Sequence, residues 1–212
     1  MTKAVLFDLD GTLVSTRPDY RYQVVGRTLS DLGRHADRCA VDAFWFGAER
    51  NAIIQAAFDV EPDLFWATYA RHDLADVRAT YTSVFGDLGA LDKLQALGVK
   101  LGIVTNAPAH VARVELALVG MDRFASIVVA NASHGIRPKP MPDGILACLQ
   151  AMALGADEAC FVGNAAEDLA AARAARVLSV HIERHEHPLS PEAVPPGHSI
   201  TDLHALLALL EP

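Results

Sequence analysis

The sequence predicts an α/β protein with a doubly wound parallel sheet, on three observations. Short apolar runs rich in β-branched residues alternate along the chain with stretches of helical periodicity, an order typical of parallel βαβ units. Three of the helical stretches stop at a glycine, namely Gly98, Gly120 and Gly155, and glycine commonly ends helices. Two carboxylates, Asp8 and Asp10, follow the first apolar run, and the carboxyl ends of parallel strands are where such sheets bind ligands.

The apolar runs are the expected strands of a Rossmann-like core. In chain order they cover residues 4–9, 99–105, 126–130, 160–163 and 178–182. The expected helices cover residues 87–97, 109–119, 143–154 and 166–175. Residues 183–198, rich in Pro, His and Glu, are expected to form a surface loop, and a last helix is expected to start near Thr201 or Asp202.

The chain between the first two expected core strands has a different sequence pattern from the core. Residues 16–83 carry helix-period patterns without strand alternation. We therefore expect residues 1–15 and 84–212 to form the α/β core, and 16–83 to form a small inserted unit that is all helical. Aromatic residues gather in this interval, and we expect most of them to pack in a helical bundle rather than to bind a ligand: Phe44, Trp45, Phe46, Phe58, Phe65, Trp66, Tyr69 and Tyr81.

Composition and charge exclude several classes of protein. A chain of 212 residues is long enough for one sizeable core and a small second domain. The net charge of -8, with scattered basic residues, disfavours nucleic acid and membrane surfaces as partners. Without an apolar stretch of membrane-spanning length or a signal-peptide pattern, a cytoplasmic protein is expected. Cys39, Cys148 and Cys160 form no CxxC pair and are expected to be buried free thiols.

The segment Asp8-Leu9-Asp10-Gly11-Thr12 is the most informative part of the sequence. Alternation along a strand places Asp8 and Asp10 on the same side, and Gly11 allows a tight turn behind them. Such a pair can bind a hard divalent cation, and one carboxylate can attack while the other transfers protons. The alternative interpretation is a strand followed by an ordinary Asx-type turn.

Two further segments carry candidate anion-binding groups. The expected strand that ends at Thr105 and Asn106 presents a hydroxyl, an amide and backbone N–H groups just before a helix, an arrangement that suits an anion. These residues could equally serve as helix caps. Lys139 lies between Pro138 and Pro140, which restrict its backbone, so its ammonium is expected to reach the acidic crevice. The alternative is an exposed lysine in a turn.

The fourth segment is Gly163-Asn164-Ala165-Ala166-Glu167-Asp168, which follows another expected strand. Together and in this order, the four segments resemble the motifs of the haloacid dehalogenase superfamily of phosphohydrolases, in particular phosphoglycolate phosphatases. The resemblance implies a magnesium-dependent phosphatase of a small phosphorylated metabolite, acting through an aspartyl-phosphate. It also implies that the helical insertion is a mobile cap over the active site.

The resemblance also implies roles for individual residues. Asp8 would be the nucleophile and Asp10 the general acid and base. Phosphate would be bound by Thr105, Lys139, Thr12 and the backbone near Leu9 and Asn106. Magnesium would be held by Asp8, Asp10, Asn164 and Asp168. The dehalogenases of the superfamily carry no carboxylate at the position of Asp10, so its presence favours phosphate-ester hydrolysis.

Asn164 and Arg176 depart from the family pattern. Family members usually have an aspartate at the position of Asn164, and a neutral amide is expected to bind magnesium more weakly. Arg176 stands where a glycine is usual. Two alternatives remain open: a phosphosugar mutase of the same superfamily, or a catalytically weak relative that acts as a binding module. Arg17, Arg50 and His72 are polar candidates for substrate contact in the inserted unit.

Overall fold

The computed structural model describes residues 2–47, 49–130, 135–184, 189 and 193–210. The chain divides into two compact units, Met1–Ser15 with Ser83–Pro212 and Thr16–Thr82. The two passages of chain between the units, β2 (Val14–Thr16) and β3 (Thr82–Val84), pair as a two-stranded sheet.

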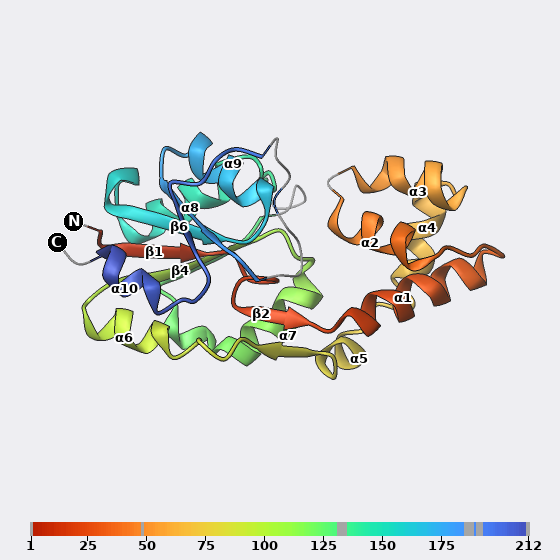
Figure 1. Cartoon of the computed structure of the whole chain (residues 1–212), viewed down its shortest axis with the longest axis horizontal. Helices are drawn as coiled ribbons and strands as arrows, with labels where there is room; N and C mark the ends of the chain where they lie inside the picture. The colour runs from red at the N-terminus through yellow and green to blue at the C-terminus, as the bar shows by residue number, and fades with distance from the viewer. Residues whose placement is uncertain (1, 48, 131–134, 185–188, 190–192, 211–212) are drawn as a thin grey trace. The chain divides into compact units, whose positions relative to one another are not determined.

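The first unit contains a parallel sheet with helices on both faces (Figure 1). Among the described residues its strand order is β5-β4-β1-β6-β7-β8, with all neighbours parallel. The strands are β1 (Ala4–Phe7), β4 (Lys100–Thr105), β5 (Ser126–Val129), β6 (Ala159–Gly163), β7 (Leu178–Ile182) and β8 (His198–Ile200). The helices are α6 (Ala90–Ala96), α7 (Ala109–Val119), α8 (Asp143–Met152), α9 (Ala166–Ala174) and α10 (Ala205–Leu210), with short 3₁₀ turns at Met121–Arg123 and Ala156–Glu158. The predicted α/β, doubly wound parallel fold is confirmed.

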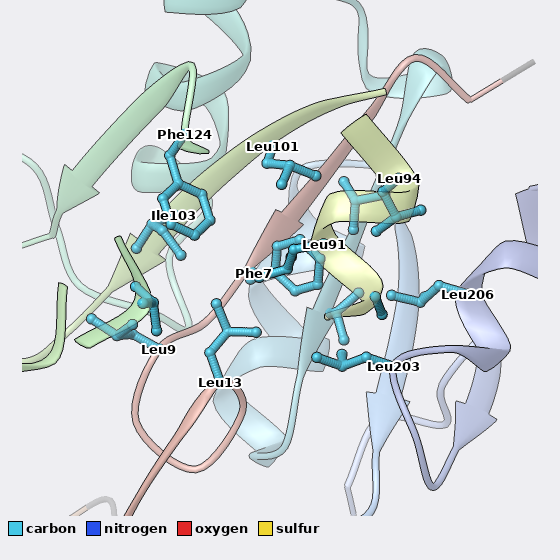
Figure 2. Close-up of a cluster of buried hydrophobic side chains, with 14 of the residues drawn as sticks. Phe7, Leu9, Leu13, Leu91, Leu94, Leu101, Ile103, Phe124, Leu203 and Leu206 are labelled. Carbon is cyan, nitrogen blue, oxygen red and sulfur yellow. The ribbon is translucent and has the colours of Figure 1, made fainter. Parts of the chain in front are cut away.

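Alternation along the central strand β1 divides the core into two clusters. Val5 and Phe7 pack with residues of α6, α7 and α10 on one face (Figure 2). Ala4 and Leu6 pack with residues of α8 and α9 on the other face. Because all four side chains are fully buried, β1 is fixed from both sides, and the residues that follow it start from a rigid position.

The structure differs from the sequence prediction at several places. The last helix, α10, begins at Ala205 and not near Thr201 or Asp202. The segment predicted as a loop contains β8, which is only three residues long and therefore gives a weak strand signal. Helix α6 begins at Ala90 instead of residue 87, because the preceding residues form tight turns in which the Ala90 N–H donates to the Asp87 carbonyl at 3.0 Å. Cys39 is exposed, since the buried positions of its helix are Val41 and Phe44; Cys148 and Cys160 are buried as predicted.

The second unit is helical. Its helices are α1 (Pro18–Asp31), α2 (Arg38–Phe46), α3 (Arg50–Phe58), α4 (Pro62–Tyr69) and α5 (Ala75–Ala79). Tyr20, Phe44, Phe58 and Phe65 are buried in one cluster, with Trp45, Trp66, Tyr69 and Tyr81 partly buried around it. The prediction that most of the aromatic residues form a bundle core is confirmed.

We expect Gly102→Ala to destabilise the first unit. Gly102 lies in β4, where an added methyl group would stand 2.6 Å from Leu6, 2.7 Å from the Cys148 sulfur and 3.1 Å from Met152. Overpacking of this kind costs about 1–3 kcal/mol. Urea denaturation measures the loss. The matched control is Gly86→Ala, which would meet nothing within 4 Å; an equal effect of the two substitutions would contradict the packing argument.

Candidate active site

Three neighbouring strands bring the predicted site residues together. The central strands lie in the order β4-β1-β6, and Thr105, Asp8 and Asn164 lie at or just after their carboxyl ends. Parallel strands end at the same edge of the sheet, so these residues converge although they are far apart in sequence.

The loop after β1 is anchored by apolar side chains that alternate with polar ones. Leu9 and Leu13 are fully buried and point into the cluster drawn in Figure 2. The Leu9 carbonyl accepts hydrogen bonds from the amides of Leu13 at 2.9 Å and Val14 at 3.1 Å. Gly11 has a φ of 82°, a conformation that an L-residue adopts only with strain. This loop therefore holds the acidic segment in one geometry.

Thr12 joins two of the predicted site residues. Its hydroxyl lies 3.3 Å from Asp8 Oδ2 and 3.2 Å from Asn164 Oδ1. A methyl group on Gly11 would clash with the Asn164 amide, so the glycine also permits this close approach. Asp8 and Asn164 thus face the same hydroxyl, as expected if the two residues serve one site.

Lys139 lies between two buried carboxylates. Its ammonium is 2.6 Å from Asp8 Oδ1 and 2.6 Å from Asp168 Oδ1, and the three side chains are 2%, 9% and 1% exposed, in the order Lys139, Asp8, Asp168. The alternative interpretation of Lys139 as an exposed lysine in a turn is therefore wrong. The structure places the Lys139 charge inside the site, next to the acidic segment.

Burial and charge shift the pKa values of this cluster. Burial raises the pKa of Asp8 to about 7; the Lys139 ammonium opposes this rise and the Asp168 carboxylate adds to it. Burial by itself would lower the pKa of Lys139, but the carboxylates of Asp168 and Asp8 outweigh it, so the lysine pKa is raised. Lys139 is therefore charged at neutral pH and favours the ionised form of Asp8.

Asn106 holds the backbone of Lys139. Its side-chain amide donates to the Lys139 carbonyl at 2.9 Å and accepts from the Lys139 N–H at 2.8 Å. These bonds fix the lysine backbone in addition to the flanking prolines. The predicted phosphate contact of Asn106 concerns its backbone N–H and stays a prediction. The sequence did not predict these two hydrogen bonds, because Asn106 and Lys139 are distant in sequence and no local sequence pattern indicates that they pair.

Thr105 is also engaged within the chain. Its hydroxyl is buried and accepts a hydrogen bond from the Ala107 N–H at 3.1 Å, just before α7. This bond closes a turn before the helix, whereas α7 has Pro108 at its N-cap position and no side-chain cap hydrogen bond, so the alternative that Thr105 and Asn106 cap the helix is wrong. A hydroxyl has two acceptor positions and one donor, so the bond does not prevent the predicted contact of Thr105 with phosphate.

Asp168 lies in the first turn of α9 and uses both carboxylate oxygens. Oδ1 accepts from Lys139, and Oδ2 accepts from the Ala165 N–H at 2.9 Å. A side chain on Gly163 would clash with Asp168, so the glycine leaves room for this return of the carboxylate. The predicted role of Asp168 as a metal ligand stays a prediction; its contacts show that it holds Lys139 and the start of α9.

Magnesium prefers oxygen ligands, and the oxygens around Asp8 suit it chemically. Asp8 offers a carboxylate, Asn164 an amide oxygen and Asp10 a backbone carbonyl, and Asp10 is half-buried at the same loop. In the described part of the chain, no group of three or more His, Cys, Asp or Glu side chains is arranged to hold a metal ion. The available donor set thus contains one full negative charge and several neutral oxygens.

The polar candidates of the helical unit have partners within that unit. Arg17 donates to the Thr80 carbonyl and lies over the Tyr81 ring. Arg50 donates to the Trp45 carbonyl at 3.0 Å. His72 lies 2.9 Å from Asp31. These contacts do not assign any of the three to a ligand, so their role in substrate binding stays a prediction.

One buried arginine beside the acidic loop was missed. Arg184 follows β7, in the segment predicted as a surface loop, and its guanidinium donates to the Thr12 carbonyl at 2.8 Å. The same guanidinium pairs with Asp87 at 2.9 Å. A single arginine in a loop of mixed composition carries no motif, so the sequence offers no signal for this contact.

The chain is similar in sequence to a known family of hydrolases. The family model of haloacid dehalogenase-like hydrolases matches residues 2–176. The chain is 33% identical to the plasmid-encoded phosphoglycolate phosphatase of Cupriavidus necator, covering 99% of this chain and 93% of that protein. It is 32% identical to the phosphoglycolate phosphatase of Rhodospirillum rubrum, covering 84% of this chain and 78% of that protein.

Solved structures agree with the fold. A HAD-superfamily hydrolase of subfamily IA from Geobacter sulfurreducens superimposes with a TM-score of 0.77 at 24% identity, covering 99% of this chain and 100% of that chain. A HAD family hydrolase from Deinococcus radiodurans, with bound phosphate and sodium, superimposes with a TM-score of 0.72 at 25% identity, covering 99% and 95%. With its four motifs at the carboxyl edge of a parallel sheet, the chain belongs to the haloacid dehalogenase-like hydrolase family.

Proposed function

We propose that the protein is a magnesium-dependent phosphatase that hydrolyses a small phosphomonoester through an aspartyl-phosphate on Asp8. The observation that carries the proposal is the buried Asp8–Lys139 pair at 2.6 Å, with the second carboxylate of Asp10 two residues after the first. The names of the two relatives and the phosphate bound to the Deinococcus radiodurans hydrolase support it. Because both relatives are named phosphoglycolate phosphatases, 2-phosphoglycolate is the first substrate to assay.

In the first half of the proposed reaction, an Asp8 carboxylate oxygen forms a bond to phosphorus while the bond from phosphorus to the ester oxygen breaks. Asp10 gives a proton to the departing alkoxide, so that an alcohol leaves. Lys139 neutralises the charge of Asp8 and reduces its repulsion of the phosphate dianion. Its position next to Asp8 needs no rearrangement at the moment of attack.

In the second half, Asp10 takes a proton from a water molecule as the water oxygen attacks phosphorus. The bond to Asp8 breaks, and inorganic phosphate and the free carboxylate are formed. Thr105, Lys139 and backbone N–H groups near Leu9 and Asn106 would bind the phosphate oxygens, with Thr12 at the same loop. Each of these residues lies at the carboxyl edge of the central strands or in the loops that follow them.

Asp8, the Asp10 carbonyl and Asn164 would hold magnesium, with Asp168 as the further candidate named above. The bound cation would neutralise charge on the transferring phosphoryl group. Because Asn164 supplies a neutral oxygen where a carboxylate is usual, we expect weak binding of the cation. The same departure favours the second candidate function, a catalytically weak relative that binds a ligand with the inherited fold.

We also propose that the helical unit Thr16–Thr82 serves as a cap that excludes water and selects the substrate. Its insertion directly after the strand that bears Asp8 supports this role. No helix among the described residues is long and apolar enough to cross a membrane. A cytoplasmic location stays a prediction.

Asp8→Asn is expected to abolish phosphate release, because an amide is a poor nucleophile toward phosphorus. The fold should persist, since the substitution is nearly isosteric and Lys139 keeps its bond to Asp168. Phosphate release from 2-phosphoglycolate with magnesium measures activity, and circular dichroism checks the fold. The control is Asp92→Asn, at an exposed ion pair with Arg123. Turnover near the wild-type rate in Asp8→Asn would refute the proposed mechanism.

Asp10→Asn is expected to lower the turnover number by about 10²–10⁴-fold, the usual contribution of general acid–base catalysis. The loss should be largest for alkyl phosphates and smaller in the first step for aryl phosphates, whose leaving groups need no proton. Pre-steady-state release of the two products separates the steps. If alkyl and aryl phosphates lose activity equally in the first step, another group donates the proton.

Asn164→Asp is expected to tighten magnesium binding, because an anionic oxygen replaces a neutral one. Titration of activity with magnesium, and calorimetric titration of the unliganded protein, measure the change. Asp168→Asn is the comparison: it should disturb Lys139 and α9 more than magnesium affinity, because both Asp168 oxygens are engaged there. If Asp168→Asn weakens magnesium binding while Asn164→Asp leaves it unchanged, Asp168 is the ligand.

A further inference from the structure

Arg184 is a buried arginine that contacts the acidic loop from outside the four motifs. Its side chain is 8% exposed. The guanidinium donates to the Thr12 carbonyl through Nη2 at 2.8 Å and through Nε at 3.3 Å. Two donors of one rigid group on a single carbonyl fix the position of that carbonyl more firmly than one flexible donor would.

The arginine is itself held from two directions. Asp87 accepts from Nη1 at 2.9 Å and from Nη2 at 3.1 Å, and its Oδ2 also accepts from the Leu203 N–H at 2.8 Å. The Phe85 ring lies 3.9 Å from the guanidinium carbon. These bonds to Arg184 and Leu203 outweigh burial and lower the pKa of Asp87. Arg184 is therefore anchored on β3–α6 and on the start of α10.

Thr12 transmits this anchoring to the reactive carboxylate. Its carbonyl accepts from Arg184, while its hydroxyl lies within 3.3 Å of Asp8 Oδ2 and 3.2 Å of Asn164 Oδ1. The opposite side of the loop is fixed by Leu9 and Leu13 in the apolar cluster. Without Arg184, the Thr12 carbonyl would lose both hydrogen bonds that the guanidinium donates to it.

We propose that Arg184, held by Asp87, is a positioning residue that sets the orientation of Thr12 and through it the attacking geometry of Asp8. The inference rests on the proposed phosphatase function. It adds a positioning residue that lies outside the four motifs. Arg184 donates to Thr12 and Asp87 and not to a reacting group, so its loss should lower kcat more than it raises KM.

The kinetic test compares Arg184→Met, Arg184→Lys and Asp87→Asn. Arg184→Met keeps an unbranched apolar stem and removes every donor; we expect kcat to fall by about 10- to 100-fold with KM within about twofold, because small misplacements of a reacting group cost this much. Arg184→Lys retains one donor for the Thr12 carbonyl and should recover part of the loss. Assays are run with magnesium, well below the lowest melting temperature of the variants.

Asp87→Asn separates positioning from stability. It removes the charge of the buried ion pair and lowers the melting temperature, but its amide oxygen can still accept a hydrogen bond from Arg184. The arginine bonds to Thr12 and most of kcat should therefore remain. Arg123→Met is the control in the same unit: it breaks an ion pair with Asp92 at 2.6 Å, just before β5 and at the amino edge of the sheet. If kcat of Asp87→Asn falls as far as that of Arg184→Met at equal loss of stability, Arg184 is merely structural and the proposal is wrong.

Amide hydrogen exchange tests the contact without any substrate. Arg184→Met should speed exchange at Leu13 and Val14, whose amides bond to Leu9 within the loop, and leave exchange in β5 unchanged. Unchanged exchange at these two amides would overturn the positioning role. A wild-type protein that hydrolyses no phosphate ester would instead refute the proposed function, and the exchange result would still decide whether Arg184 orders the loop.

Discussion

The site depends on one buried cation between two buried carboxylates. Lys139 compensates Asp8 and Asp168 at 2.6 Å each, and all three side chains lie almost wholly away from solvent. Loss of Lys139 would leave two buried carboxylates without a partner, and breaking a buried ion pair in this way typically costs about 3–5 kcal/mol, whereas desolvation of the charges offsets much of what the intact cluster gains. The cluster is thus a poor device for stability alone. Its charge instead favours the ionised form of Asp8, because the Lys139 ammonium opposes the rise in the Asp8 pKa that burial causes.

The rest of the first unit serves to place these three charges. β1 is packed from both faces, so Asp8 starts from a fixed strand end. Asn106 fixes the lysine backbone with two reciprocal hydrogen bonds, and Asp168 is held by the amide of Ala165. Each charged group therefore has a support that comes from the end of a different strand or from the loop that follows it. A parallel sheet provides these supports because its strands end side by side.

The sequence predicts the parts of this arrangement that depend on local patterns. Short apolar runs identify β4 and β7 closely, and the glycines that follow α6 and α7 mark where those helices end, whereas α8 ends at Met152, before Gly155. Contacts between distant residues that belong to no motif are beyond such patterns. Asn106 and Lys139 are 33 residues apart, and Arg184 reaches Thr12 across 172 residues. The three residues of β8 pair only because β7 is already in place.

The charge balance of the cluster gives a physical reason why an asparagine can stand at position 164. With Asp8, Asp168 and Lys139 charged, the buried set already carries one net negative charge. Thr12 has one hydroxyl proton and faces two acceptors, Asp8 and Asn164, so it can satisfy only one of them at a time. A carboxylate at position 164 would put a second unpaired negative charge beside that hydroxyl and would need a bound cation to offset it. The amide leaves the unliganded site closer to neutral, at the expense of cation affinity. The Thr12 loop, which Arg184 and the buried leucines hold in place, can then keep its geometry before any ligand arrives.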